Sequence, residues 1–185
     1  MASLPSSKTV TYEEWLRTPE VTDAIEEVVN GEIRIMPPAK WKHALIVARL
    51  NAALVAQLDI GRIYVLAGGF DLIIRKAPLT ARVPDLAVFE AATLVERDGR
   101  AHSAPQLVVE VLSPANTRRE REEKLADYAE MGVPEVWVIS PEARTVEVLH
   151  WEDGFLRRSQ ILASGTLTPR LFPHVAIDIA GMWPD

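Results

Sequence analysis

The sequence predicts an α/β fold with a mixed central sheet flanked by helices. The strongest indication is a strand–helix–strand unit, in which apolar segments at 106–113 and 135–140 surround a charged helical segment at 117–131. Apolar strands of this kind are typical of a sheet that is covered on both faces. The preceding part of the chain is expected to form a helix, a hairpin, a second helix and further strands, and this mixture also indicates the α/β class.

A short helix and a hairpin are expected first. Thr11 and the glutamate three residues later form a capping box, so a helix should begin there, and Pro19 is expected to end it. Asn30-Gly31 lies between the alternating segments of residues 27–35, which is the strongest short-range indication of a hairpin.

A long helix is expected over residues 40–58, because apolar residues recur there at three- and four-residue steps and form one face. Gly61 follows as a stop signal. Strands are then expected at 62–66, 70–75, 83–89 and 106–113.

Both ends of the helix over residues 117–131 are marked in the sequence. Thr117 and Glu120 form a second capping box, and Gly132 stands where a C-terminal cap is expected. Further strands are expected near 135–140, 145–151 and 155–162, with Asp153-Gly154 at the turn between the last two.

Composition limits the class of protein. The chain has 185 residues, of which 48% are hydrophobic and 25% charged, and no linker or repeat divides it, so we expect residues 1–185 to form one domain. It has no cysteine, which excludes disulfides and thiolate zinc sites. The net charge of −6 argues against coating of nucleic acid through the overall field but allows a local basic surface.

No membrane partner and no secretion are expected. The chain has no apolar run near the roughly 18 residues that a membrane span needs. Its N-terminus lacks a basic region followed by an apolar stretch, so it does not indicate a secretion signal. We therefore expect a cytoplasmic protein.

Two of the predicted strands each carry a single acid, Asp85 in 83–89 and Glu110 in 106–113. A carboxylate that loses its hydration needs a hydrogen-bond partner, a cation or a metal. If the two strands are neighbours, alternation allows both carboxylates to converge near one end of the sheet. Such oxygen ligands suit Mg²⁺ or Mn²⁺, which can polarise a phosphoryl oxygen and lower the pKa of bound water.

Each acid also has a simpler interpretation. Asp85 follows Pro84 and can shape the entrance of its strand, and Glu110 can form a buried salt bridge to an arginine. The two acids together are a stronger indication of a metal site than either one alone.

Several motifs follow one another along the chain. They are Glu-x-x-x-Gly-Glu at 27–32, His43, Pro84-Asp85, residues 109–114, Lys124, Tyr128 and residues 132–139. In the order of these motifs the chain resembles the Uma family of putative restriction endonucleases, within the PD-(D/E)XK nuclease superfamily. The resemblance covers roughly residues 12–180. It implies a restriction-endonuclease-like sheet and a magnesium- or manganese-dependent endonuclease that acts on DNA.

The resemblance also implies roles for particular residues. Asp85 and Glu110 would hold the metal, and Glu27 would add a further acid. The superfamily's lysine usually lies two residues after the second acid, where this chain has Leu112. Lys124, on the following helix, is the natural replacement and would orient the attacking water or stabilise charge on the phosphoryl group.

Lys124 has a simpler interpretation as a helix-surface partner of Glu120, four residues earlier. Glu27 can be one of several exposed acids, and Tyr128 can simply pack. His43 lies on the apolar face of its helix, where a hydrogen-bonded core histidine is expected more often than a ligand.

Two basic groups are candidates for contacting nucleic acid. Arg118, Arg119 and Arg121 can contact phosphates, although a solvated helix face is the simpler interpretation. Lys42 adjoins Trp41, an aromatic that can stack on a base, although a helix entrance with a packing tryptophan is simpler. We favour the simpler interpretation for both groups.

The leading hypothesis is a metal-dependent phosphodiesterase that hydrolyses the DNA backbone with a metal-activated water. The alternative is a catalytically silent nucleic-acid-binding or assembly protein that retains the nuclease fold, which Leu112 favours. A hydrolase of small phosphoesters is a further alternative, which a narrow enclosed pocket would support. A homodimer through the strands at 146–151 and 155–162 is possible, since a duplex has two strands to cut.

Overall fold

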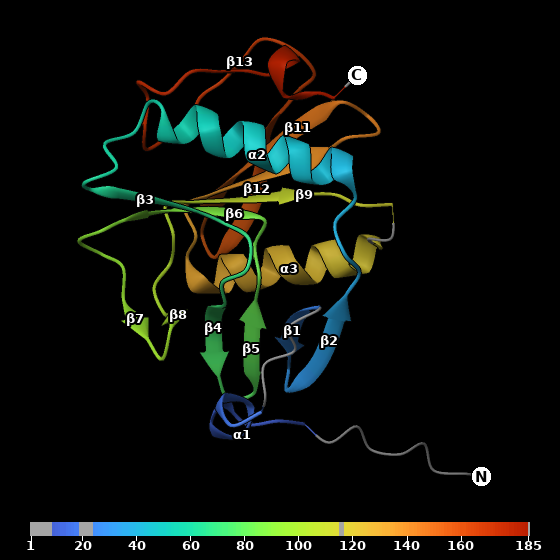
Figure 1. Ribbon diagram of the computed structural model, residues 1–185, viewed down its shortest axis with the longest axis vertical. Helices are drawn as coiled ribbons and strands as arrows, with labels where there is room; N and C mark the ends of the chain where they lie inside the picture. Colours follow the sequence, from blue (N-terminus) through green and yellow to red (C-terminus); the bar gives the residue numbers. More distant parts are fainter. Residues whose placement is uncertain (1–8, 19–23, 115–116, 185) are drawn as a thin grey trace.

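The computed structural model describes residues 9–18, 24–114 and 117–184. Within these residues two six-stranded sheets are arranged with helices in layers. Helix α2 (Trp41–Val55) covers one sheet, and α3 (Arg118–Met131) lies between that sheet and the other (Figure 1). The predicted α/β class with a mixed central sheet is confirmed.

The first sheet, called the central sheet below, contains the predicted strand–helix–strand unit. In spatial order its strands are β12 (Phe155–Leu162), β11 (Thr145–Glu152), β10 (Glu135–Ser140), β9 (Leu107–Val111), β6 (Leu86–Glu90) and β3 (Ile63–Ala67). Strands β9 and β10 run parallel, with Val138 opposite Glu110, and α3 connects them. The other neighbouring strands in this sheet are antiparallel.

Helix α3 begins and ends where the sequence predicts. Thr117 and Glu120 form the capping box through both of its hydrogen bonds. Gly132 ends the helix at φ 80°, a left-handed conformation that glycine adopts without steric cost. The two ends of α3 are therefore set by local sequence.

The sequence analysis expected the hairpin at 27–35 and a strand at 70–75 but not that they belong to a second sheet. Its strands in spatial order are β2 (Glu32–Met36), β1 (Ile25–Val29), β5 (Leu79–Arg82), β4 (Leu72–Lys76), β8 (Arg100–Ala101) and β7 (Glu96–Arg97). The predicted hairpin at 27–35 forms β1 and β2 and pairs with β5 through Val28 and Ala81.

The predicted strand at 83–89 begins later than expected. Strand β6 starts at Leu86, and residues 83–85 connect it to β5. Pro84 lacks a backbone N–H and so cannot donate to a sheet ladder. Asp85 consequently lies just before β6, with a side chain that is free to turn toward the end of the neighbouring strand.

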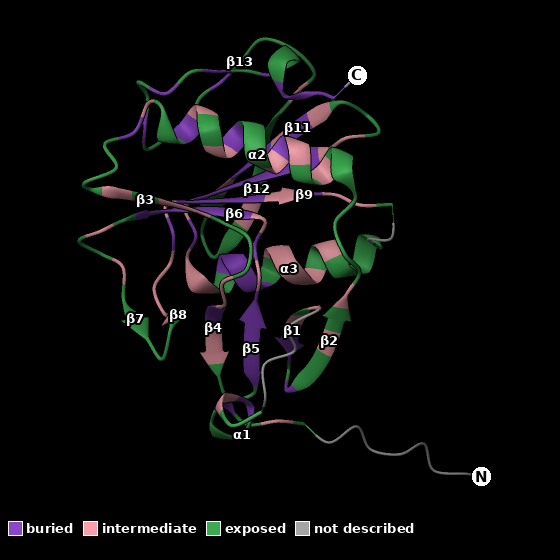
Figure 2. Ribbon diagram, in the orientation of Figure 1, coloured by how far each residue is buried: buried purple, intermediate pink, exposed green. Residues whose placement is uncertain are grey.

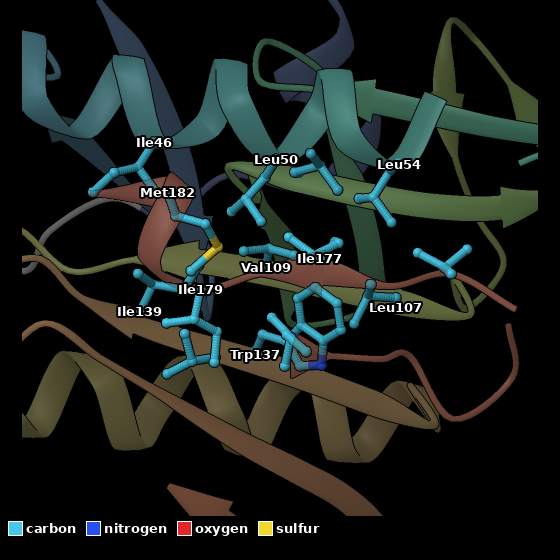
Figure 3. Close-up of a cluster of buried hydrophobic side chains, with 14 of the residues drawn as sticks. Ile46, Leu50, Leu54, Leu107, Val109, Trp137, Ile139, Ile177, Ile179 and Met182 are labelled. Carbon is cyan, nitrogen blue, oxygen red and sulfur yellow. The ribbon is translucent and has the colours of Figure 1, made fainter. Parts of the chain in front are cut away.

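The core has an apolar layer on each side of the central sheet. Ile46, Leu50 and Leu54 of α2 pack on β9 and β10, together with C-terminal side chains such as Ile179 and Met182 (Figure 3). On the opposite face, side chains of α3 and β4 complete a second cluster, which contains Leu72, Phe89, Val108, Tyr128 and Val136.

Of the remaining elements, the C-terminal ones pack in the same layer as α2 on the central sheet, and the short N-terminal helix packs on the second sheet. These elements are α1 (Tyr12–Leu16), β13 (Thr166–Leu167), β14 (Ile177–Asp178) and the 3₁₀ helix η1 (Ala180–Met182). Strand β5 is buried along its whole length, whereas β2 is largely exposed (Figure 2). In the described part of the chain, no helix has the length and apolarity to cross a membrane.

Candidate active site

The candidate site lies where β6 begins and β9 ends. The antiparallel register places Leu86 opposite Val109, so Asp85 and Glu110 are brought to the same end of two neighbouring strands. The Asp85 carboxylate accepts a hydrogen bond of 2.7 Å from the backbone N–H of Val111. The predicted adjacency of the two acid-bearing strands is therefore present.

The second oxygen of Asp85 contacts α2. Nε2 of His43 lies 2.9 Å from Oδ1 of Asp85, and the carboxylate can only accept, so Nε2 carries the proton. The hydrogen bond to Asp85 raises the pKa of His43, although burial opposes the shift. His43 is thus a hydrogen-bonded histidine, and its partner is one of the candidate metal ligands.

Glu110 points toward α3 and is held by two side chains. Nζ of Lys124 lies 3.1 and 3.0 Å from its two oxygens, and the Tyr128 hydroxyl donates to Oε1. Burial raises the pKa of Glu110 to about 7; Lys124 opposes that rise, and the carboxylates of Asp85 and Glu27 add to it. Glu110 therefore carries a carboxylate whose charge is only partly compensated. The cation of its buried ion pair is a lysine, where the simpler sequence interpretation expected an arginine.

Glu27 enters the site from β1 of the second sheet. Its side chain is 2% exposed and contacts Arg82 at 2.8 Å and Lys124 at 2.9 Å, while the backbone N–H of Val83 donates at 3.2 Å. Burial alone would raise the pKa of Glu27, but the charges of Lys124 and Arg82 outweigh it and lower the pKa. Glu27 is buried in the structure, not exposed.

Lys124 joins the two acids that come from different sheets. Its ammonium lies 2.9 Å from Glu27 and 3.0 Å from Glu110. Burial lowers its pKa, but the carboxylates of Glu110 and Glu27 outweigh burial and raise it, so the side chain is a cation. Glu120, the helix-surface partner considered above, instead bonds the hydroxyl and backbone N–H of Thr117.

Arg82 and Asp127 are site-supporting residues that the sequence analysis missed. Arg82 is buried between Glu27 and Asp127, and its Nε donates to Asp127 at 2.8 Å. Asp127 belongs to α3, one residue before Tyr128, and also contacts Arg75 at 3.3 Å. This chain of contacts fixes α3 to the second sheet. Strand β5 was not predicted, and no local pattern in the sequence indicates that Arg82 is buried.

The four candidate residues open onto one cavity. A hollow of about 580 Å³ is lined by Glu27, Asp85, Glu110 and Lys124, with Trp41 and Lys42 among its other lining residues. The candidate catalytic residues are therefore brought together, although they come from two sheets and one helix.

The basic residues at the start of α3 are paired with acids. Arg118 contacts Glu122 at 2.7 Å, and Arg119 contacts Glu123 at 3.0 Å. Arg121 contacts Glu147 of β11 at 2.7 Å. These pairs fit the simpler interpretation of a solvated helix face, and their contact with nucleic acid stays a prediction.

The donor chemistry of the cavity fits a hard divalent cation. Across residues 9–18, 24–114 and 117–184, no group of three or more His, Asp or Glu side chains is arranged as a metal site. Asp85 and Glu110 nevertheless provide two carboxylates in one cavity, and Mg²⁺ is commonly bound by one or two carboxylates while it keeps several waters. The two residues would hold such an ion.

The layered sheets and the acids at one strand end define a nuclease-like mixed α/β protein. Residues 11–180 match the Uma2 family, described as "putative restriction endonuclease", and the chain belongs to this family. The family resemblance expected from the motifs is confirmed. No curated protein matches the chain.

A solved structure supports the fold. The chain is similar to the crystal structure of a putative nuclease belonging to DUF820 from Anabaena variabilis ATCC 29413, with a TM-score of 0.77 and 20% sequence identity. The similarity covers 94% of this chain and 97% of the other. At this level of identity the likeness shows that the two proteins share a fold.

Proposed function

We propose that the protein is a magnesium- or manganese-dependent endonuclease that hydrolyses the DNA backbone with a metal-activated water. The observation that carries the proposal is the shared cavity, in which Glu27, Asp85, Glu110 and Lys124 converge. Membership of a family described as restriction endonucleases supports DNA as the substrate.

Asp85 and Glu110 hold the divalent cation in this proposal. When bound, the cation supplies a water of lowered pKa and polarises a phosphoryl oxygen. The Val111 N–H and His43 fix both oxygens of Asp85, which presets the direction of this carboxylate. Tyr128 orients Glu110 in the same way.

Lys124 supplies a positive charge beside the reacting phosphate. Its ammonium is held between Glu27 and Glu110, and it remains protonated because the carboxylates raise its pKa. A fixed ammonium of this kind stabilises charge that develops on phosphoryl oxygens. Lys124 thus takes the role that Leu112 cannot fill.

Contacts outside the cavity belong to the same proposal. Arg118, Arg119, Arg121 and Lys42 contact the DNA backbone, which would require the arginines to exchange their glutamate partners for phosphates. Strand β12 is an edge strand with Phe155 66% and Ile161 50% exposed, and a homodimer would cover it.

A catalytically silent nucleic-acid-binding or assembly protein is the second candidate. Leu112 in the usual lysine position favours it, and so does the occupation of both Glu110 oxygens by Lys124. In that case Lys124 neutralises the acids in place of a metal. The silent protein would bind DNA without hydrolysing it.

Cleavage assays on plasmid and single-stranded DNA with Mn²⁺ test the proposal. We expect the wild-type protein to cleave, and Asp85→Asn and Glu110→Gln to lose roughly 100-fold or more of that activity. Lys124→Met should also lose cleavage but keep metal affinity. Wild-type protein that binds DNA without cleaving it would establish the silent alternative, and near wild-type cleavage by Lys124→Met would exclude the role given to this lysine.

A further inference from the structure

Trp41 differs from the other tryptophans of the chain. Its side chain is 63% exposed, compared with 41% for Trp151 and 9% or less for Trp15, Trp137 and Trp183. It begins α2 and lines the same cavity as Asp85 and Glu110. Tryptophan is enriched at binding interfaces, where its large ring supplies much of the contact area.

The lining of the cavity also includes an apolar, proline-rich set of residues: Met36, Pro37, Pro38, Pro114 and Pro141. Because the proline ring fixes φ, the backbone has less conformational freedom at these four prolines. The volume of about 580 Å³ falls within the range of roughly 300–1,000 Å³ that is typical of pockets for small organic groups.

Positive charge accompanies the aromatic ring. Lys40 and Lys42 line the cavity next to Trp41, and Nζ of Lys42 lies 5.5 Å from the centroid of the Trp41 ring. A ring with ammonium groups beside it suits a group that is flat and apolar on one side and carries a phosphate on the other. A nucleotide has this chemistry.

We propose that Trp41 stacks on an unpaired base of the substrate, so that the enzyme acts on single-stranded DNA or at unpaired positions. This inference rests on the proposed function, because the divalent cation held by the acids of the same cavity would bind the adjoining phosphate. In an intact duplex, neighbouring bases cover both faces of each base, so a side chain can stack only on a base that has left the helix. Lys42 then contacts the phosphate of that nucleotide.

Binding of fluorescent oligonucleotides in Ca²⁺ tests the inference, with a single strand and its duplex compared by anisotropy. Trp41→Ala should weaken single-strand binding by about 5- to 100-fold and leave duplex binding unchanged. Trp41→Phe should retain most of the affinity, because phenylalanine also stacks. Tyr64→Ala is the matched control, since Tyr64 is an aromatic residue that is 43% exposed on β3 and does not line the cavity.

Several results would overturn the inference. Unchanged single-strand affinity in Trp41→Ala would reject it, and so would an equal loss for the single strand and the duplex. If the wild type cleaves DNA with Mn²⁺ and Trp41→Ala gives either of these two binding results, only the base-stacking inference fails. If the wild type neither binds nor cleaves any DNA, the proposed function fails and the inference fails with it.

Discussion

Glu27 and Glu110, whose side chains are 2% and 13% exposed, share Lys124 as an ion-pair partner, yet their surroundings differ. Glu27 contacts Arg82, Lys124 and a backbone N–H, and these contacts lower its pKa despite burial. Glu110 has Lys124 and the neutral Tyr128 hydroxyl, and burial raises its pKa to about 7.

The difference assigns different work to the two acids. A carboxylate whose negative charge is fully compensated by its partners is stabilised little by a further cation. A carboxylate whose charge is only partly compensated is stabilised much more. We therefore propose that Glu27 serves mainly to hold Lys124 in place and that Glu110 binds the metal. Perturbed pKa values often gather at functional sites, and the acid whose pKa is raised, Glu110, is the one beside Asp85.

The largest expected loss of stability comes from removing Arg82, the arginine that pairs with Glu27. Arg82→Met leaves Glu27 and Asp127 buried without their shared cation, so we expect the free energy of unfolding to fall by about 3–5 kcal/mol. Urea unfolding measures this change. Adding Glu27→Gln to Arg82→Met should recover part of the loss, because it removes one of the two acids that lost Arg82 as a partner.

Arg75→Met is the matched control for Arg82→Met. Arg75 also contacts Asp127, but its side chain is 23% exposed, so water can replace the lost contact and we expect a cost of about 1 kcal/mol or less. Equal losses in the two variants would show that burial of Arg82 is not what makes its ion pairs important.

The raised pKa of Glu110 predicts a pH dependence of stability in metal-free buffer. Between its ordinary value of 4.5 and about 7, the folded protein holds a proton on Glu110 that the unfolded chain has lost. The free energy of unfolding should therefore fall as pH rises through this window. Glu110→Gln should reduce that fall by on the order of 1–3 kcal/mol, as measured by urea unfolding at pH 5 and pH 8. A steeper fall in the variant would contradict the assignment.

The smallest changes in stability are expected from substitutions at the exposed start of α3. Arg118 and Arg119 are 91% and 87% exposed and pair with glutamates four residues later, so replacing either by alanine should change stability by only a few tenths of a kcal/mol. If they contact phosphates as proposed, the double variant should instead weaken DNA binding and reduce its dependence on salt. A titration at several salt concentrations separates the two roles.

Local sequence features predicted one half of the site but not the other. Glu110 and Lys124 lie on the strand–helix–strand unit, and Asp85 directly precedes the neighbouring strand β6. The helix of the unit is delimited by Thr117 and Gly132, and these signals act over a few residues. This is why the order of motifs also carried the family resemblance, which the family match over residues 11–180 confirms.

The Arg82 network depends on pairing between distant parts of the chain. Arg82 meets Asp127 across 45 residues and Glu27 across 55, and β5 is only four residues long. An arginine at the end of so short a segment gives no periodic pattern that indicates burial. Its burial becomes evident only when the second sheet and α3 are placed together.

Calorimetric titration with Mn²⁺ at pH 8 tests the central claim most directly. We expect the wild type to bind Mn²⁺, Asp85→Asn and Glu110→Gln each to lose roughly 10- to 100-fold or more in affinity, and Glu27→Gln to lose clearly less. Wild-type affinity in both Asp85→Asn and Glu110→Gln, or a loss in Glu27→Gln as large as that in Glu110→Gln, would contradict the account.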